Sequence, residues 1–328
     1  MAPARNLLLV GATGTIGSYI LDAILSTRNQ FGRVAILTSA RTAETKASYL
    51  NDLKTQKNVE VIVGNIEDEN AVKAAYEGMY RSAAHFDQSK LTRLLGIDTV
   101  ISALGRTALA QQIPLIKLAA ASSSVKWFLP SEYGTDIAYG PASVNEKPHQ
   151  QKLKVRALLE KEISRADLEY TYVVTGPFAD MYLHLVPGLE EAGGWDVKAK
   201  KAVLLGEKGE DKISLTTMKD SNPEIRNRAL CVNSFTTSPA QIQAEFERQT
   251  GSKWDSISYT PLPRLRELEA KTWEDGNPAA TAVTLRRIWT EGGTLYAQRD
   301  NVKVGEPRMM GLEEVVRNEI SRVLGSSL

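Results

Sequence analysis

The first half of the chain alternates short apolar runs with longer segments in which apolar residues recur every three or four positions. The clearest helical segment carries Ile16, Tyr19, Ile20, Ala23 and Ile24 at the spacing of a single apolar helix face. Strand-sized runs that alternate with such segments are typical of repeated βα units. The pattern therefore predicts an α/β fold built on a doubly wound parallel sheet. The predicted strands are Leu7–Val10, Val34–Thr38, Val59–Val63, Thr99–Ser102, Trp127–Leu129 and Tyr170–Val174.

The regular alternation fades after Pro177, where turns, lysines and isolated aromatic residues become more frequent. We therefore expect a main domain over residues 1–178 and a smaller C-terminal substrate-binding region over residues 179–328. The stretch Lys198–Lys212 mixes charges of both signs and is interpreted as a solvated hairpin. The remaining predicted elements are a strand at Ala229–Asn233, in a segment 229–235 that returns to the main sheet, and helices at Pro239–Gln249 and Leu312–Val323.

A glycine-rich turn, Val10-Gly11-Ala12-Thr13-Gly14-Thr15-Ile16-Gly17, directly follows the first predicted strand and directly precedes the first predicted helix. In a dinucleotide-binding (Rossmann) turn, Gly11 permits the tight turn, Gly14 lets the backbone approach a pyrophosphate, and Gly17 lets the helix pack on the strand. The N–H groups that open the helix then face the anion. An ordinary turn is the alternative, and the spacing differs from the standard fingerprint by one residue. The strand, turn and helix in register favour dinucleotide binding.

The end of the second predicted strand bears on the choice of cofactor. An acidic residue there accepts from a free ribose 2′-hydroxyl, whereas a cation meets a 2′-phosphate. The sequence has Ser39 and Arg41 at this place, no Asp or Glu in the turn, and Lys46 a few residues later. These residues favour NADP(H), although Arg41 as an ordinary solvated residue is the alternative.

Composition narrows the class of protein. With 42% hydrophobic and 24% charged residues, the chain has the composition of a folded protein rather than a disordered one. The 40 Lys and Arg nearly balance the 39 Asp and Glu, so we expect no nucleic-acid partner and no anionic membrane partner. One cysteine and three separated histidines disfavour disulfides and metal centres. No secretory signal or membrane-spanning run is recognisable, which favours a soluble cytoplasmic protein.

Lysine placement on a later helix suggests a chemical role. None of the tyrosines has a lysine four residues later, so the usual proton-donor pair of short-chain dehydrogenases is absent. Lys152 instead extends an apolar helix stripe, whereas Lys154 points to the opposite side. Partial burial and the positive end of a helix both favour the neutral form of a lysine, which suits proton transfer. A snorkelling lysine at a helix end is the alternative. The stripe consists of Val155, Leu158, Leu159, Ile163 and Ala166.

Five segments together resemble the isoflavone reductase-like branch of the atypical short-chain dehydrogenases, also grouped as NmrA-like, and particularly its fungal members. They occur in the family's order over more than half of the chain. The segments are Gly11-Ala12-Thr13-Gly14-Thr15-Ile16-Gly17, Val100-Ile101-Ser102-Ala103-Leu104-Gly105, Phe128-Leu129-Pro130-Ser131-Glu132-Tyr133-Gly134, Lys152-Leu153-Lys154-Val155-Arg156 and Tyr170-Thr171-Tyr172-Val173-Val174-Thr175-Gly176-Pro177-Phe178.

The resemblance implies an NADPH-dependent reductase of a small aromatic or heterocyclic secondary metabolite, acting at a C=C bond, a benzylic ether or an imine-type centre. Lys152, four residues before Arg156, falls on the family's catalytic lysine and would steer or supply the proton. A non-catalytic NADP-binding redox sensor is the main alternative, and a nucleotide-sugar epimerase is disfavoured by the absent Tyr-Lys pair. The cofactor-binding residues implied or predicted are Gly11, Thr13, Gly14, Thr15, Ile16, Gly17, Ser39, Arg41, Ser102, Ala103, Leu104, Gly105, Pro130, Glu132, Lys152, Gly176, Pro177 and Phe178.

Several residues are weaker candidates. Glu132 either contacts substrate or caps the turn after the fifth strand, and His149 either relays a proton or is simply exposed. Aromatic and sulfur side chains after the fifth and sixth strands either line a substrate pocket or pack in the core. We expect a small-molecule substrate and a monomer or homodimer. The substrate-side candidates are Tyr133, His149, Met181 and Tyr182.

The sequence departs from the family in two places. Relatives often have an arginine directly at the end of the second strand, where this chain has Ser39 and a displaced Arg41. Relatives also continue into an apolar helix after the equivalent of Asp220, whereas Ser221-Asn222-Pro223 follows at once here. We expect this missing helix to thin the packing beside the last strand and to reshape the substrate side.

Overall fold

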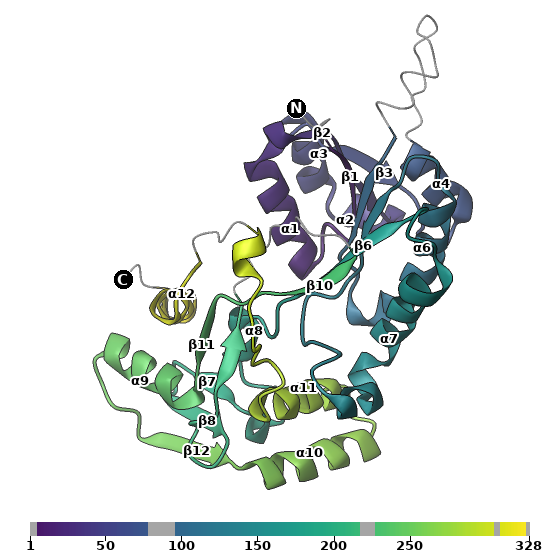
Figure 1. The fold of residues 1–328 in the computed structure, drawn as a ribbon. Helices are drawn as coiled ribbons and strands as arrows, with labels where there is room; N and C mark the ends of the chain where they lie inside the picture. The colour runs from purple at the N-terminus through teal and green to yellow at the C-terminus, as the bar shows by residue number, and fades with distance from the viewer. Residues whose placement is uncertain (1–4, 78–95, 217–226, 305–308, 326–328) are drawn as a thin grey trace, which may run out of the picture. The chain divides into compact units, whose positions relative to one another are not determined.

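A seven-stranded sheet organises the N-terminal part of the computed structural model, which describes residues 5–77, 96–216, 227–304 and 309–325 (Figure 1). In the spatial order β6, β5, β4, β1, β2, β3, each strand pairs in parallel with the next. Strands that follow one another in the chain run outward on either side of β1 and β4, which is the doubly wound order. The predicted fold class is therefore confirmed. In spatial order the strands are β10 (Arg228–Cys231), β6 (Glu169–Val174), β5 (Trp127–Leu129), β4 (Thr99–Ser102), β1 (Arg5–Val10), β2 (Phe31–Thr38) and β3 (Glu60–Val63).

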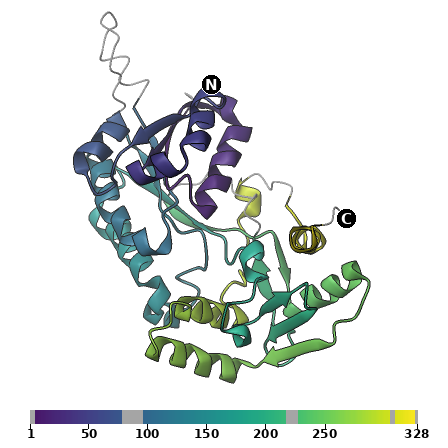
Figure 2. The same ribbon diagram turned by 180° about the vertical axis from the view of Figure 1, so that it is seen from behind.

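Helices cover both faces of this sheet, with α1 and α3 on one face and α4, α6 and α7 on the other (Figures 1 and 2). This is the arrangement that right-handed crossovers between parallel strands produce. The helices of this part are α1 (Thr15–Ser26), α2 (Ala40–Thr45), α3 (Ala47–Thr55), α4 (Glu69–Glu77), α6 (Gln112–Ala121) and α7 (Gln150–Ala157), with short 3₁₀ turns at Arg28–Gln30 and Arg106–Gln111.

The buried face of α1 differs from the prediction at Tyr19 and Leu21. Ile20 and Ile24 are buried, but Tyr19 is 38% exposed and Leu21 is fully buried. At 100° per residue, Gly17, Ile20, Leu21 and Ile24 make the tighter stripe, and Tyr19 lies off its edge. Tyr19 on the apolar face was therefore a wrong prediction.

The helix that carries Lys152 is shorter than its apolar stripe suggests. The α-helical hydrogen bonding of α7 ends at Ala157 and passes into a π turn over Leu158–Glu162. The amide of Ile163 donates to the Leu158 carbonyl and closes this wide turn. Ala166 therefore lies outside the helix and is exposed, so its predicted place in the stripe is wrong.

The described residues group into two compact units that do not follow one cut in the sequence. The first unit falls within ranges 1–132, 151–173 and 221–229, and the second within 133–150, 174–220 and 230–328. The predicted division at residue 178 stays a prediction. The second unit contains α8 (Ala179–Tyr182), β7 (Gly194–Asp196), β8 (Lys201–Leu205), β9 (Ile213–Leu215), β11 (Phe235–Thr237), α9 (Pro239–Thr250), β12 (Ser256–Thr260), α10 (Leu262–Glu274), α11 (Ala280–Thr290) and α12 (Leu312–Leu324), with 3₁₀ turns at Pro141–Asn145, Lys147–His149, Glu190–Ala192 and Asn301–Val304.

Two small sheets lie in the second unit, one of β12, β8 and β7 and one of β11 and β9. Strand β8 pairs antiparallel with β7 and parallel with β12, so it is the central strand of its sheet. Its Ala202, Leu204 and Leu205 are buried. The turn 198–200 is exposed, as a solvated hairpin requires, but β8 itself belongs to the core. The solvated-hairpin interpretation of Lys198–Lys212 is therefore wrong for β8.

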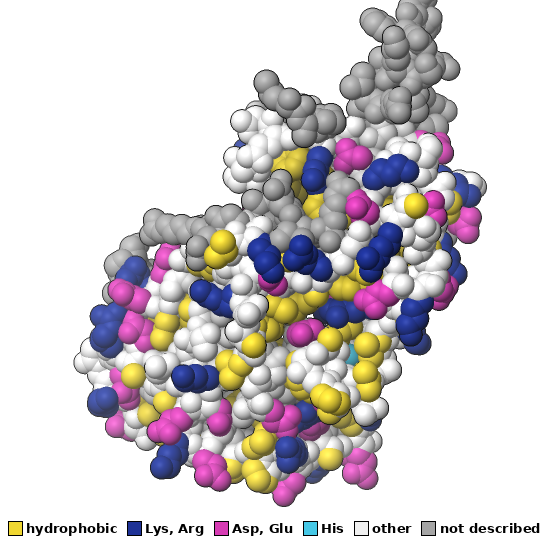
Figure 3. Space-filling model, viewed as in Figure 1, with side chains coloured by type: hydrophobic (Ala, Val, Ile, Leu, Met, Phe, Trp, Pro, Cys, Tyr) yellow, Lys and Arg dark blue, Asp and Glu magenta, His cyan; other side chains and the backbone are white. Residues whose placement is uncertain are grey.

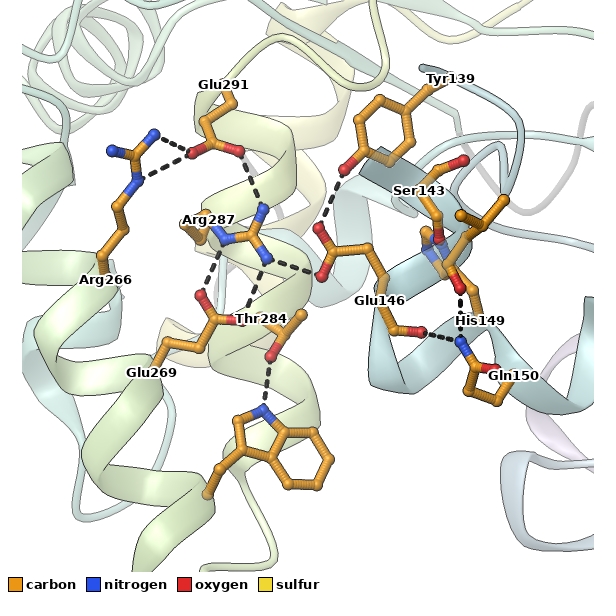
Figure 4. Close-up of polar contacts among 12 residues, drawn as sticks. Tyr139, Ser143, Glu146, His149, Gln150, Arg266, Glu269, Thr284, Arg287 and Glu291 are labelled. Atoms are coloured by element: carbon orange, nitrogen blue, oxygen red, sulfur yellow. Dashed lines mark hydrogen bonds and ion pairs between the residues drawn. The ribbon is translucent and has the colours of Figure 1, made fainter. Parts of the chain in front are cut away.

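A network of charges ties helices α10 and α11 to the loop that precedes Lys152 in the chain (Figure 4). Arg287 of α11 contacts the carboxylates of Glu146 at 2.7 Å, Glu269 at 2.8 Å and Glu291 at 2.9 Å. The Tyr139 hydroxyl donates to the other oxygen of Glu146 at 3.0 Å. Burial and the carboxylate of Glu146 raise the pKa of Tyr139 to about 12, so this hydroxyl stays a donor at neutral pH. The network fixes the loop within the second unit.

We expect Arg287→Met to destabilise the second unit by about 3 kcal/mol at neutral pH, because it leaves half-buried carboxylates without their cation. Burial is the largest single influence on the pKa of Glu269 and raises it, but the hydrogen bonds from Arg287 and Thr284 and the charges of Arg287 and Arg266 together outweigh burial and lower this pKa. A lowered folded-state pKa gives stability above the ordinary glutamate value that is lost as the pH falls below it. Urea unfolding at pH 7 and pH 4 measures both effects, and the variant should lose less stability on acidification than the wild type.

Arg266→Met is the matched control, because Arg266 also contacts Glu291 but its side chain is 61% exposed. Exposed pairs contribute about 0–1 kcal/mol. Equal losses in the two variants would contradict the importance assigned to the Arg287 network.

Basic and acidic side chains are interspersed on the face drawn in Figure 3, in line with the near balance of charges in the sequence. Among the described residues, no helix is long and apolar enough to span a membrane. The missing helix expected around Ser221-Asn222-Pro223 lies outside the described residues.

Candidate functional site

The glycine turn lies where the order of the sheet reverses. Strand β1 leads into Gly11 and the adjacent β4 leads into Ala103, and the Ala103 amide donates to the Val10 carbonyl at 2.8 Å. Gly11 has φ +84°, and a Cβ there would come within 2.5 Å of the Ala103 carbonyl oxygen. The two turns are therefore in backbone contact at the carboxyl edge of the sheet. This switch point is where doubly wound sheets bind their ligands.

Helix α1 begins at this turn with its first N–H groups uncapped by any side chain. Its N-cap is the exposed Gly14, whose amide donates to the Gly11 carbonyl at 3.0 Å. A Cβ on Gly17 would overlap the Gly11 carbonyl oxygen, so only glycine lets the helix approach the turn this closely. A helix that opens on bare backbone offers N–H donors and a positive dipole end to an anion.

The segment after β2 carries two cations, of which Lys46 contacts the glycine turn. Ser39 caps α2, since its Oγ accepts from the Thr42 amide at 3.2 Å. Arg41 is exposed in the first turn of α2. The Nζ of Lys46, at the other end of α2, donates to the Thr13 carbonyl at 2.8 Å. Lys46 therefore connects α2 to the glycine turn. This contact makes Lys46 a stronger candidate for cofactor binding than its position in the sequence suggests.

Ser131 joins the turns that follow β4 and β5. Its Oγ contacts the Ser102 Oγ at 3.0 Å and receives the Leu104 amide at 2.8 Å. Its own amide donates to the Gln112 side chain at 2.7 Å. The segment from Ser102 to Leu104 is thereby fixed beside Pro130. Ser131 was not among the predicted site residues, although it lies within the third of the segments that carry the family resemblance.

Glu132, Lys152 and Arg156 form a buried charged cluster in the first unit. Glu132 is only 2% exposed, and Arg156 donates to both of its carboxylate oxygens, at 2.9 and 3.1 Å. The Nζ of Lys152 donates to the main-chain carbonyl of Glu132 and lies 3.8 Å from its Oε2. The cluster holds two cations and one carboxylate. Its net positive charge favours a partner on which negative charge develops.

The two lysines of α7 differ as the sequence predicts. The Lys152 side chain is 13% exposed, whereas Lys154 is exposed. Glu132 does not cap the turn with its carboxylate, because Arg156 engages both oxygens. The Arg156 guanidinium in turn lies 4.4 Å from the centre of the Tyr172 ring. Sequence reasoning treated Arg156 only as a marker for Lys152, and the pairing with Glu132 is what it missed.

The segment Gly176 to Phe178 is held within the second unit. The Gly176 amide donates to the Gly134 carbonyl at 2.9 Å, and the Ala179 amide donates to the Thr216 carbonyl at 3.0 Å. Gly176 has φ +67°, and a Cβ there would lie 3.3 Å from the Tyr296 hydroxyl oxygen. Burial raises the pKa of Tyr296, which stays protonated at neutral pH. A turn that favours glycine therefore follows β6.

The substrate-side candidates occupy different environments in the second unit. His149 is only 2% exposed, so the alternative of a simply exposed histidine is wrong; its Nδ1 lies 3.0 Å from the Ser143 carbonyl oxygen (Figure 4). Tyr182 is buried and packs its ring 6.0 Å from that of Trp195. Tyr133 is half-buried and Met181 is 58% exposed. The structure places Tyr182 and Trp195 in one apolar core and Met181 at the surface.

The predicted cofactor-side residues gather mainly in the first unit, at the carboxyl ends of β1, β2, β4 and β5. The helix α7 adds Lys152 to the turn after β5. Gly176, Pro177 and Phe178 belong to the second unit, as do the four substrate-side candidates. The described residues contain no group of three or more His, Cys, Asp or Glu arranged to hold a metal ion.

Known proteins resemble this chain in sequence and in fold. The sequence model of the NmrA-like family matches residues 3–269. A phenylcoumaran benzylic ether reductase of Pyrus communis is 25% identical over 276 residues, covering 81% of this chain and 80% of that protein. An isoflavone reductase of Pisum sativum is 24% identical over 294 residues, covering 83% and 84%. The solved complex of leucoanthocyanidin reductase with NADPH from Vitis vinifera has a TM-score of 0.71 at 19% identity, covering 96% of this chain and 99% of that one.

Proposed function

Because the chain belongs to the NmrA-like family, we propose that it is an NADPH-dependent reductase of a small aromatic or heterocyclic metabolite. The observation that carries the proposal combines two features of the first unit. A glycine turn without a capping side chain opens α1 at the switch point of the sheet, and the nearly buried Lys152 contacts the turn after β5. The first feature suits a dinucleotide and the second suits proton transfer. The similarity to plant reductases that include an NADPH complex supports the same chemistry.

The residues at the switch point fit NADPH. The N–H groups that open α1 would hold the pyrophosphate, because no side chain of the protein caps them. Arg41 and Lys46 carry the positive charge that a ribose 2′-phosphate requires. When bound, NADPH supplies a hydride from its nicotinamide. Ser131 holds the turn after β4 in place, and the turn after β5 begins at Pro130.

Lys152 provides the proton in this proposal. Its ammonium is fixed by the Glu132 carbonyl, and it donates a proton to the substrate atom that becomes negative when the substrate carbon receives the hydride. Lys152 then regains its proton from water, so each turnover consumes one hydride and one proton. The net positive charge of the Lys152, Arg156 and Glu132 cluster stabilises the developing anion.

Two measurements test the proposed function. Calorimetry should show NADPH binding, and single-turnover oxidation of the bound NADPH should occur with at least one class among phenylpropanoids, quinones and cyclic imines. Tight NADPH binding without oxidation by any class would instead indicate a redox sensor. No binding of NADPH would contradict the proposal altogether.

We expect Arg41→Ala combined with Lys46→Ala to weaken NADPH binding by about tenfold or more while leaving NADH binding nearly unchanged. Each charged hydrogen bond to a phosphate contributes about 1.5–3 kcal/mol when formed, and NADH lacks the phosphate. Calorimetric titration with both cofactors measures the ratio of affinities. Lys54→Ala, an exposed lysine in the last turn of α3, is the control and should leave the ratio unchanged. A wild-type ratio near one would remove the basis for NADPH over NADH.

A further inference from the structure

The Glu132 carboxylate is already fully engaged by Arg156. Both of its oxygens receive guanidinium donors, and its side chain is only 1% exposed. A bidentate Arg–carboxylate pair is geometrically specific and strong. The carboxylate of Glu132 is therefore already occupied, which disfavours both roles that its position in the chain suggests: contact with substrate and capping of the turn after β5.

The same glutamate reaches Lys152 through two groups. Its main-chain carbonyl accepts from the lysine Nζ, and its Oε2 lies 3.8 Å from that nitrogen. Lys152 and Arg156 are four residues apart on α7, so their side chains share one helix face and their charges repel. The carboxylate between them offsets this repulsion. Without it, two nearly buried cations would face each other.

Arg156 is itself held from the other side. Its guanidinium lies over the Tyr172 ring at 4.4 Å, and the Tyr172 hydroxyl donates to the Glu160 carboxylate at 3.0 Å. Stacking on a ring and bidentate pairing both restrict the guanidinium to one orientation. The fixed order is thus Tyr172, Arg156, Glu132 and then Lys152.

We propose that Arg156 and the Glu132 carboxylate are positioning residues that hold the Lys152 ammonium in place and set its charge balance. This inference rests on the proposed function, since it gives Lys152 its task. Arg156 engages the carboxylate of Glu132 and so weakens the attraction of that carboxylate for Lys152. The carboxylate in turn offsets the repulsion between the two cations. The two residues therefore act on Lys152 in opposite electrostatic directions.

The test compares Glu132→Gln with Arg156→Met. In Glu132→Gln the lysine loses its negative neighbour, so the alkaline limb of the pH–rate profile should move to lower pH. In Arg156→Met the carboxylate is free to engage Lys152, so the same limb should move to higher pH. We expect kcat to fall by about 10²-fold in each variant with little change in NADPH affinity, as a misplaced catalytic group predicts. Arg165→Met, an exposed arginine beyond α7, is the control and should match the wild type.

Competitive labelling with acetic anhydride gives a readout that needs no substrate. In the protein without cofactor, Lys152 should react faster relative to Lys154 in Glu132→Gln and more slowly in Arg156→Met, because only the neutral amine reacts. Shifts in the same direction in both variants, or no shift, would overturn the proposal. Arg156→Lys keeps the charge but not the bidentate geometry, and serves if Arg156→Met fails to fold. If the wild-type protein oxidised NADPH with no substrate class while the expected order of labelling rates was observed, only the proposed function would be rejected.

Discussion

Replacing Lys152 with Met should lower turnover by about 10²–10⁴-fold, the usual contribution of a positioned acid or base. The change removes the ammonium but keeps an unbranched apolar stem of similar length against the nearly buried site. NADPH affinity should change little, because the residues proposed to hold the phosphates lie on other elements. Steady-state turnover and calorimetric titration, carried out on the same preparation, separate the two effects.

Lys154→Met is the matched control, since Lys154 lies on the same helix and is exposed. It should retain wild-type turnover. If Lys152→Met also retained turnover, another group would have to supply the proton, and the assignment of Lys152 would be wrong.

Replacing Gly17 with Ala should abolish NADPH binding or weaken it more than a hundredfold. The new Cβ overlaps the Gly11 carbonyl oxygen, which is main chain and cannot move aside like a flexible side chain. Either α1 shifts away from β1 or the turn opens, and both displace the N–H groups proposed to hold the pyrophosphate. Calorimetry measures the loss of affinity, and circular dichroism with thermal unfolding reports how much of the fold is retained.

Gly140→Ala is the control for glycine replacement as such. Gly140 has φ −175° in extended backbone, and a Cβ there meets nothing within 4 Å. This variant should bind NADPH as the wild type does. Normal binding by Gly17→Ala would contradict the structural reason given for that glycine.

The elements of the main sheet could be predicted because each carries its own local signal. Thr99–Ser102 and Trp127–Leu129 have the predicted bounds, and the remaining predicted strands of the sheet differ by up to three residues at their ends. Strands buried on both faces are continuous apolar runs, and a parallel arrangement leaves few possible connections. The hydrophobic period was less informative where a helix changes its geometry. The π turn after Ala157 has the same apolar residues as a regular helix, so nothing in the pattern marks it.

Buried polar residues were the harder part of the site. Glu132 and His149 belong to residue types that are usually exposed or only partly buried, and their burial depends on partners distant in the sequence. Arg286 shows the same limit: it is 4% exposed and donates to the carbonyls of Tyr182, His184 and Ala192 in the second unit. Burial lowers the pKa of this arginine to about 10. Such pairings are tertiary, and no local spacing encodes them.

The candidate site could therefore be predicted in its parts but not in its connections. The glycine turn, Lys152 and the cations near the second strand all have local signals in the sequence. The bridge from Lys46 to Thr13 and the engagement of Glu132 by Arg156 became visible only in the fold. These connections decide which residues touch a ligand and which position another residue.

The most direct test of hydride transfer uses NADPH that carries deuterium at both positions of C4 of the nicotinamide, so that either face delivers the label. The protein is incubated with the labelled cofactor and the substrate class that oxidises it, and the product is analysed by mass spectrometry. We expect one deuterium at the reduced carbon of the product with wild-type protein, and a greatly reduced yield of that product with Lys152→Met. A reduced product without deuterium, or no reduced product from any class while NADPH remains tightly bound, would contradict it.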